Sequence, residues 1–257
     1  MDFLQAIIFG VVQGISEFLP ISSTGHLILT GRFLGLTQTE FLKSFEIAIQ
    51  LGSILSVIAL YWRQLFTDWE TIKRVIVAFI PTGILGLIFY KIVKQYLLSS
   101  NSVVLWSLFL GGAFLIIFEL WHKEKEDVNE EVIRISYKQS LLIGIAQSVA
   151  MVPGVSRSAA TILGGLALGI KRKTIVEFSF LLAVPTMLAA TGLDLIKNAN
   201  QFSSSQWNFL VVGFIVSFIV ALASIKFLLN FIKKHSFIPF GIYRIMIALI
   251  FWLIILK

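Results

Sequence analysis

The chain has 257 residues, of which 57% are hydrophobic and 14% are charged, and its mean hydropathy is +0.90. Soluble domains carry about 25% charged residues, so a chain this apolar cannot cover its surface with polar groups and is expected in a bilayer. It contains no cysteine, which excludes disulfides and thiolate metal sites. The formal net charge of +7 does not indicate nucleic-acid binding, because the basic residues lie between apolar runs rather than in one patch.

Apolar segments of two lengths alternate along the chain. Long segments, close to the ~20 residues that a transmembrane helix needs, cover Phe45–Trp62, Val75–Tyr90, Val103–Trp121, Thr174–Ile196, Phe209–Ile232 and Phe237–Leu256. Short segments of roughly 10–14 residues cover Phe3–Val12, Leu27–Leu36, Gln139–Val152 and Ala159–Ile170. Helices of this shorter length do not cross a bilayer and are typical of re-entrant elements.

Each pair of short segments brackets a polar stretch, "LPISSTGH" in the first and "VPGVSRS" in the second. Proline and glycine stop helices, and non-helical backbone at membrane depth survives only when it is buried in protein or lines a wet cavity. The sequence therefore predicts an all-α integral membrane protein with six transmembrane helices and two re-entrant helix hairpins.

The two halves of the chain resemble one another. "GVVQGISEFLPISS" aligns with "GIAQSVAMVPGVSR", which pairs Gln13 with Gln147 and Ser22 with Ser156, 134 residues apart. "FEIAIQLGS" and "FIPTGILGL" match "FSFLLAVPT" and "FIVSFIVAL" at offsets of 133 and 135 residues. Three long helices per half bring the second copy in from the opposite face, so we expect an inverted repeat. Residues 1–121 form the first copy, 122–138 a cytoplasmic connector that includes an acidic run, and 139–257 the second copy.

Lysine and arginine indicate the orientation. The side opposite the opening of the first hairpin carries Arg63, Lys73, Arg74, Lys123, Lys125, Arg134, Lys138, Lys171, Arg172, Lys173, Lys233 and Lys234. The other side carries only Arg32, Lys43, Lys91, Lys94, Lys197 and Lys257. The positive-inside rule places the first set in the cytoplasm, so the first hairpin is expected to open to the outer face.

The first polar stretch gathers reactive side chains. Glu17 follows Gln13 by four residues, so both project from one face of a helix, and Ser22, Ser23, Thr24 and His26 follow Pro20. A hydroxyl, an imidazole and a carboxylate in one loop supply a nucleophile, a proton shuttle and a base or metal ligand. Helix capping by the hydroxyls is the simpler alternative, but it does not explain an ionisable Glu17 at membrane depth.

The second polar stretch places Arg157 between Ser156 and Ser158, with Thr161 one turn further on. A guanidinium fork flanked by hydroxyls at a helix start suits phosphate oxygens. A structural ion pair between Arg157 and Glu17 across the two tips is a compatible alternative, because a ligand can share that pair.

Other intramembrane polar residues carry less weight. Glu46, Gln50 and Glu177 are better explained by structural pairing or capping than by a site, which stays open as the alternative. Arg244 lies in an apolar segment and is expected to need a buried partner.

"QGISEFLPISSTGH", "PGVSRSAAT" and the "FEIAIQLGS"/"EFSFLLAVP" pair resemble the undecaprenyl pyrophosphate phosphatase family, also called bacitracin-resistance proteins, over the whole length. The resemblance implies an enzyme of the bacterial inner membrane that removes the terminal phosphate from an isoprenyl diphosphate and so recycles the carrier lipid of cell-wall synthesis. It implies a divalent cation (Mg or Ca), a site open to the outer face, and a homodimer as a candidate assembly.

The resemblance carries the catalytic residues over as Glu17, Ser23, His26 and Arg157, with Glu17 also as metal ligand. The substrate-binding residues are Gln13, Ser22, Thr24, Ser156, Ser158 and Thr161. Some members have Glu where this chain has Gln13, which leaves Glu17 as the principal carboxylate. Ser23 is expected to attack phosphorus with His26 as proton carrier. Ser22, or an activated water, is the competing nucleophile.

Two other classes compete. Secondary transporters and lipid flippases are also built from inverted repeats with broken helices. Phosphatidic-acid-type phosphatases share the serine, histidine and arginine pattern, but they need a second histidine followed by an acidic residue after the arginine. His235, the only histidine after Arg157, stands beside lysines, so that class is rejected.

Overall fold

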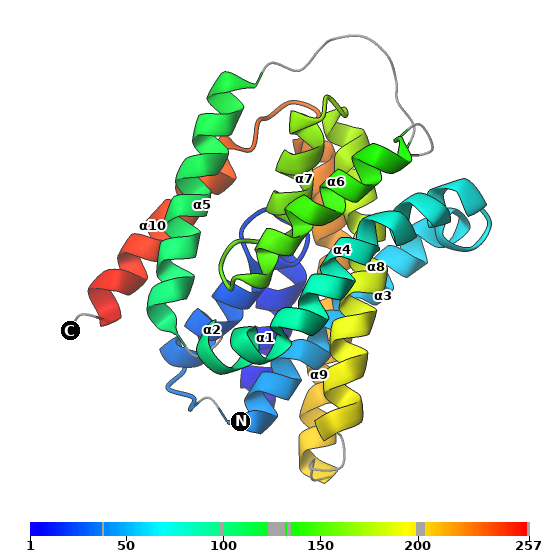
Figure 1. The fold of residues 1–257 in the computed structure, drawn as a ribbon. Coiled ribbons are helices and arrows are strands. Elements are labelled where there is room, and N and C mark those ends of the chain that lie inside the picture. Colours follow the sequence, from blue (N-terminus) through cyan, green and yellow to red (C-terminus); the bar gives the residue numbers. More distant parts are fainter. Residues whose placement is uncertain (38, 98–99, 123–131, 133–134, 199–203, 256–257) are drawn as a thin grey trace.

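The computed structural model describes residues 1–257 except 38, 98–99, 123–131, 133–134, 199–203 and 256–257. The described residues form α-helices without strands (Figure 1): α1 (Phe3–Ser16), α2 (Ser23–Phe33), α3 (Glu40–Phe66), α4 (Trp69–Ile92), α5 (Asn101–Trp121), α6 (Tyr137–Ser148), α7 (Arg157–Ala167), α8 (Arg172–Asn198), α9 (Ser204–Phe231) and α10 (Ile238–Ile255). The predicted all-α class is confirmed.

The helix lengths follow the apolar segments of the sequence. Among the described residues, five helices are long and apolar enough to cross a bilayer, namely α3, α4, α5, α8 and α9. The sixth expected span corresponds to α10, which is shorter. The four short segments are α1, α2, α6 and α7. Most of the expected connector, including its acidic run, lies outside the described residues.

The short helices that lead into the polar loops begin in the same way in both halves. Asp2 caps α1 by accepting a hydrogen bond from the Gln5 backbone N–H, and Gln5 Oε1 accepts from the Asp2 N–H. Ser136 and Gln139 form the same reciprocal pair at the start of α6. Such capping boxes satisfy backbone donors that a helix start otherwise leaves free. Both helices therefore begin at a defined residue and end where their polar loops start.

Helices from the two halves exchange partners. The first short helix of each half packs on a long helix of the other half: α1 on α9 and α6 on α4. Helix α3 contacts both α8 and α9, and α5 runs beside α10 at one side of the molecule (Figure 1). This exchange brings the loop between α1 and α2 close to the loop between α6 and α7.

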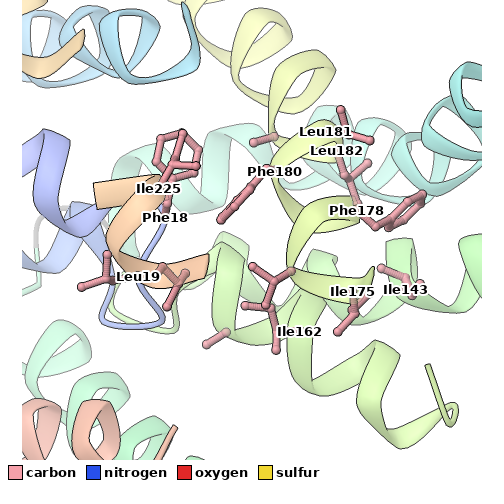
Figure 2. Packing of buried hydrophobic residues seen from close by; sticks show 14 of the residues in the cluster. Phe18, Leu19, Ile143, Ile162, Ile175, Phe178, Phe180, Leu181, Leu182 and Ile225 are labelled. Atoms are coloured by element: carbon pink, nitrogen blue, oxygen red, sulfur yellow. The ribbon is translucent and has the colours of Figure 1, made fainter. Parts of the chain in front are cut away.

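A buried apolar cluster lies directly behind these loops (Figure 2). Phe18, next to Glu17, meets Phe180 of α8 edge to face with ring centroids 5.2 Å apart. Ile162 of α7 and Ile225 of α9 belong to the same cluster. Aromatic pairs of this geometry are favourable beyond their buried area. The cluster therefore fixes the end of α1 against α7, α8 and α9, which positions the polar side chains that follow.

Candidate active site

The two polar loops end on serines with an unusual backbone conformation. Ser22 and Ser156 have φ of 75° and 81°, in the left-handed region that residues other than glycine rarely adopt. Each is an N-cap: Ser22 Oγ accepts from the Gly25 N–H at 3.3 Å, and Ser156 Oγ accepts from the Ala159 N–H at 3.2 Å. The capping alternative therefore describes what these two hydroxyls do in this structure. Strained backbone of this kind is found preferentially at functional sites.

Glu17 is the centre of a buried polar network, and only 3% of its surface is exposed. Its Oε2 accepts from Gln13 Nε2 at 2.8 Å and from Ser23 Oγ at 2.7 Å. Its Oε1 lies 3.1 Å from Arg157 Nη2 in a buried ion pair. The structure thus brings together four side chains that the sequence singled out, from both polar stretches.

Helix α8 holds Arg157 from behind. Arg157 Nη1 donates to the Ser179 carbonyl at 2.7 Å and lies 3.3 Å from its hydroxyl, which pairs with Thr161 Oγ1 at 2.6 Å. Within the described part of the chain, Arg157 Nε and Ser158 Oγ are buried without a hydrogen-bond partner. Buried polar groups are almost always paired, so these atoms mark a place where another polar group is expected.

His26 does not take the position expected for a proton carrier of Ser23. Its Nδ1 donates to the Ser22 carbonyl at 2.7 Å, which leaves Nε2 to accept from the Tyr243 hydroxyl at 2.9 Å. Ser23 is the first residue of α2 and its hydroxyl turns back to Glu17, whereas the ring of His26 turns toward α10. In the structure, Glu17 is therefore the hydrogen-bond partner of Ser23.

A cavity of about 650 Å³ opens beside the two loops. Six of the expected site residues line it: Glu17, Ser22, Ser23, Thr24, Ser156 and Arg157. Gln13, His26, Ser158 and Thr161 are not among its lining residues and lie behind them. Of the less-weighted residues, Gln50 lines the cavity, whereas Glu46 and Glu177 do not.

The rest of the cavity wall is mainly apolar. Helix α4 contributes Phe79, Ile80, Ile84 and Leu87, and α8 contributes Met187, Ala189 and Ala190. Glu40 and Lys43, at the start of α3, also line the cavity and pair with each other at 2.9 Å. The cavity therefore offers a polar end and an apolar wall to one ligand.

Several residues of the network were not expected from the sequence. Ser53 lies 3.4 Å from Gln13 Nε2 and pairs with Ser217 at 2.7 Å. In the second half, Gln147 Nε2 donates to Thr82 and Thr186 at 2.9 and 3.2 Å. The signal that could have found them is their polarity within otherwise apolar spans, read together with the Gln13–Gln147 match.

Oxygen atoms of Glu17 and Gln13 are candidate ligands for a divalent cation. The described residues hold no cluster of three or more His, Asp or Glu side chains. Mg²⁺ is usually held by one or two carboxylates together with substrate phosphates and water. Glu17 at the cavity wall fits that pattern, and beside it the buried Gln13 Oε1 is an oxygen without a hydrogen-bond partner among the described residues. The residues fit a cation that arrives with a phosphate ligand.

The fold and the site define a multi-pass helical membrane protein with a buried carboxylate, serine and arginine at one end of an amphipathic cavity. Residues 6–250 match the family described as bacitracin resistance protein BacA. The chain belongs to this family.

Curated relatives cover nearly the whole chain. The undecaprenyl-diphosphatase of Sulfurihydrogenibium sp. is 55% identical over 254 residues, which are 98% of this chain and 99% of the relative. The undecaprenyl-diphosphatase of Aquifex aeolicus is 53% identical over 247 residues, 96% of each chain. The enzyme of the same name from Methanococcus aeolicus is 48% identical over 250 residues, 97% of each chain.

Proposed function

We propose that this protein is a membrane phosphatase that hydrolyses undecaprenyl diphosphate to undecaprenyl phosphate and inorganic phosphate. Family membership and the names of relatives at 48–55% identity support this function. The single structural observation that carries it is the hydrogen bond from Ser23 Oγ to Glu17 Oε2, with Arg157 on the other carboxylate oxygen. Phosphoryl transfer can use a nucleophile, a base and a positive group that stabilises the phosphate oxygens. Ser23, Glu17 and Arg157 supply these groups at the cavity wall.

The shape and polarity of the cavity support a lipid diphosphate as substrate. Its polar end, at the two loops, suits a phosphate group, because Arg157 and the start of α7 offer N–H donors. Its apolar wall on α4 and α8 suits an isoprenyl chain. A single site therefore accommodates both ends of an amphipathic ligand.

Ser23 is the nucleophile of the proposed reaction. Its oxygen attacks the terminal phosphorus while Glu17, 2.7 Å away, accepts the hydroxyl proton. The bond from that phosphorus to the bridging oxygen breaks, and undecaprenyl phosphate leaves. Water then cleaves the phosphoserine, which releases inorganic phosphate and restores the hydroxyl. An attacking water held by Ser23 and deprotonated by Glu17 is the competing mechanism.

Arg157 stabilises negative charge on the phosphoryl oxygens. Its Nε has no hydrogen-bond partner among the described residues, and its Nη2 is shared with Glu17, so it can contact a phosphate without leaving Ser179. Glu17 and Gln13 Oε1 would hold the divalent cation. When bound, the cation would neutralise phosphate charge and polarise the P–O bonds.

His26 acts through position rather than by proton transfer to Ser23. Its hydrogen bonds to the Ser22 carbonyl and to Tyr243 hold the strained loop against α10. Thr24 lines the cavity and is proposed as a substrate contact, together with Ser22 and Ser156. Gln13, Ser158 and Thr161 support Glu17 and Arg157 from behind.

For the membrane arrangement, we propose six transmembrane helices, with α10 as the sixth, and two re-entrant hairpins, α1–α2 and α6–α7, in an inverted repeat. The matching capping boxes, the matching strain at Ser22 and Ser156, and the packing of α1 and α6 on long helices of the other half support the repeat.

The proposed location of the protein is the bacterial inner membrane. A cavity that reaches the start of α3 and the later parts of α4 and α8 supports an opening to the outer face. A homodimer stays a prediction. Nothing in the comparisons favours the transporter or flippase alternative.

Phosphate release by the purified protein tests the function. The protein in detergent, with Mg²⁺, is expected to release inorganic phosphate from undecaprenyl diphosphate and leave the monophosphate, while Glu17→Gln, nearly identical in shape, does not. Folding of both is checked by gel filtration and thermal unfolding. Folded wild-type protein that releases no phosphate from this substrate would contradict the proposal.

A further inference from the structure

Arg244 of α10 is a fully buried cation, with an exposed fraction of 0%. Its guanidinium carries five N–H groups, and within the described part of the chain each of its five hydrogen bonds ends on a backbone carbonyl. Nη1 donates to Pro20 and Val155 at 3.2 and 2.9 Å, Nη2 to Ser107 and Gly154 at 3.0 and 2.8 Å, and Nε to Leu108 at 3.4 Å. The sequence predicted that Arg244 needs a buried partner but did not identify it. In the structure, backbone carbonyls take that role.

These carbonyls belong to three separate segments. Pro20 lies midway between Glu17 and Ser23 in the first loop. Gly154 and Val155 lie just before Arg157 in the second loop, and Ser107 and Leu108 belong to α5. One side chain thus joins the loop that carries the carboxylate and the nucleophile to the loop that carries the phosphate-binding arginine. Arg244 does not line the cavity.

The surroundings are shaped to hold this guanidinium. A Cβ at Gly111 of α5 would collide with Arg244 Nη2, so the guanidinium would have to shift to make room for one. Gly154 has φ of +93°, and a Cβ there would come within 2.7 Å of the Val104 carbonyl oxygen, so the second loop closes tightly on α5. The neighbouring Tyr243 contacts His26 of the first hairpin.

We propose that Arg244 is a positioning residue for phosphoryl transfer, which fixes the two loops relative to one another so that Ser23 and Glu17 face Arg157. The inference rests on the proposed function. A planar guanidinium can satisfy five carbonyls in three directions, whereas an ammonium offers three donors from one point. Small displacements of reacting groups cost on the order of 10²-fold in rate. Loss of the Arg244 guanidinium fork is therefore expected to lower turnover.

The test is Arg244→Lys in the purified protein, which keeps the charge and loses the fork. Turnover of undecaprenyl diphosphate is expected to fall on the order of 10²-fold, with KM changed by less than about threefold, because the Arg244 side chain does not itself line the cavity. The matched control is Arg172→Lys. Arg172 is a partly buried arginine whose guanidinium fork binds Glu119 at 2.6 and 3.1 Å, and it does not line the cavity. Its variant should keep turnover within about twofold of wild type.

A double-mutant cycle separates positioning from general destabilisation. If Arg244 acts by holding Arg157 against Glu17, Arg244→Lys should reduce activity by less than about threefold further in an Arg157→Lys background. Losses that multiply in full would overturn the positioning role, as would a wild-type kcat in folded Arg244→Lys.

If Arg244→Lys does not fold, Gly111→Ala tests the positioning role instead. This variant keeps Arg244 but moves its guanidinium out of place. We expect a lower kcat at unchanged KM, and an unchanged kcat would overturn the inference.

Wild-type protein from the same preparation distinguishes the two proposals. Absence of phosphate release from folded wild-type protein contradicts the proposed function. Normal wild-type turnover together with normal turnover of Arg244→Lys contradicts only the positioning role.

Discussion

The carboxylate of Glu17 and the guanidinium of Arg157 meet at 3.1 Å, although 140 residues separate them along the chain. Each residue stands at the loop of a different short hairpin, and both side chains are almost fully buried. A buried pair of this kind loses its solvation on folding, so it is weak support for stability and stronger support for a site.

Arg157→Lys tests the guanidinium fork. The lysine keeps a positive charge but cannot bind Ser179, Glu17 and a phosphate together, so activity is expected to fall by ~10²-fold or more. The measurement is steady-state phosphate release by folded, purified variant. Turnover close to that of wild type would exclude a bidentate role for Arg157.

Ser23→Ala tests the nucleophile. Because it removes only the bond-forming oxygen, phosphate release should be abolished while binding of a non-hydrolysable prenyl diphosphonate is retained. Ser136→Ala is the matched control: it removes the N-cap of α6 at a position that does not line the cavity, with a loss of ~1 kcal/mol in stability, and should keep activity. A Ser23→Ala rate above about a tenth of wild type, a loss of only ~1.4 kcal/mol, would favour an activated water instead.

Gln13→Glu tests the cation site. The Gln13 amide donates to Glu17 at 2.8 Å, so the substitution sets two carboxylates side by side. Two like charges this close repel unless a proton or a cation lies between them. We expect the Mg²⁺ concentration for half-maximal activity to fall severalfold in a Mg²⁺ titration. An unchanged titration curve would place the cation away from Gln13.

Cysteine labelling tests the orientation. The chain has no native cysteine, so Thr37→Cys and Lys234→Cys each provide a single thiol at an exposed position. In intact cells an impermeant maleimide should label the first and not the second, because the positive-inside rule puts Lys234 in the cytoplasm. The reverse pattern would move the cavity opening to the cytoplasmic side.

Local features of the sequence were sufficient to predict where the helices lie. Segment length and hydropathy predicted the long and short helices, because the spacing of apolar residues and the position of Pro and Gly act within a few turns of the chain. The sequence alignment paired Ser22 with Ser156, and in the structure both are N-caps with a similar, unusual φ. The grouping of Gln13, Glu17 and Ser23 follows from their closeness in sequence.

Contacts between distant segments were decided by the tertiary structure alone. The sequence predicted that Ser23 would pair with His26, three residues on, but packing of α10 against α5 brings Tyr243 to the imidazole and leaves Glu17 as the partner of Ser23. The same packing presents five backbone carbonyls to Arg244 from segments up to 224 residues away. Hydropathy marks Arg244 as buried, yet every backbone carbonyl looks alike in a sequence, so only the approach of the two loops and α5 decides which ones it binds.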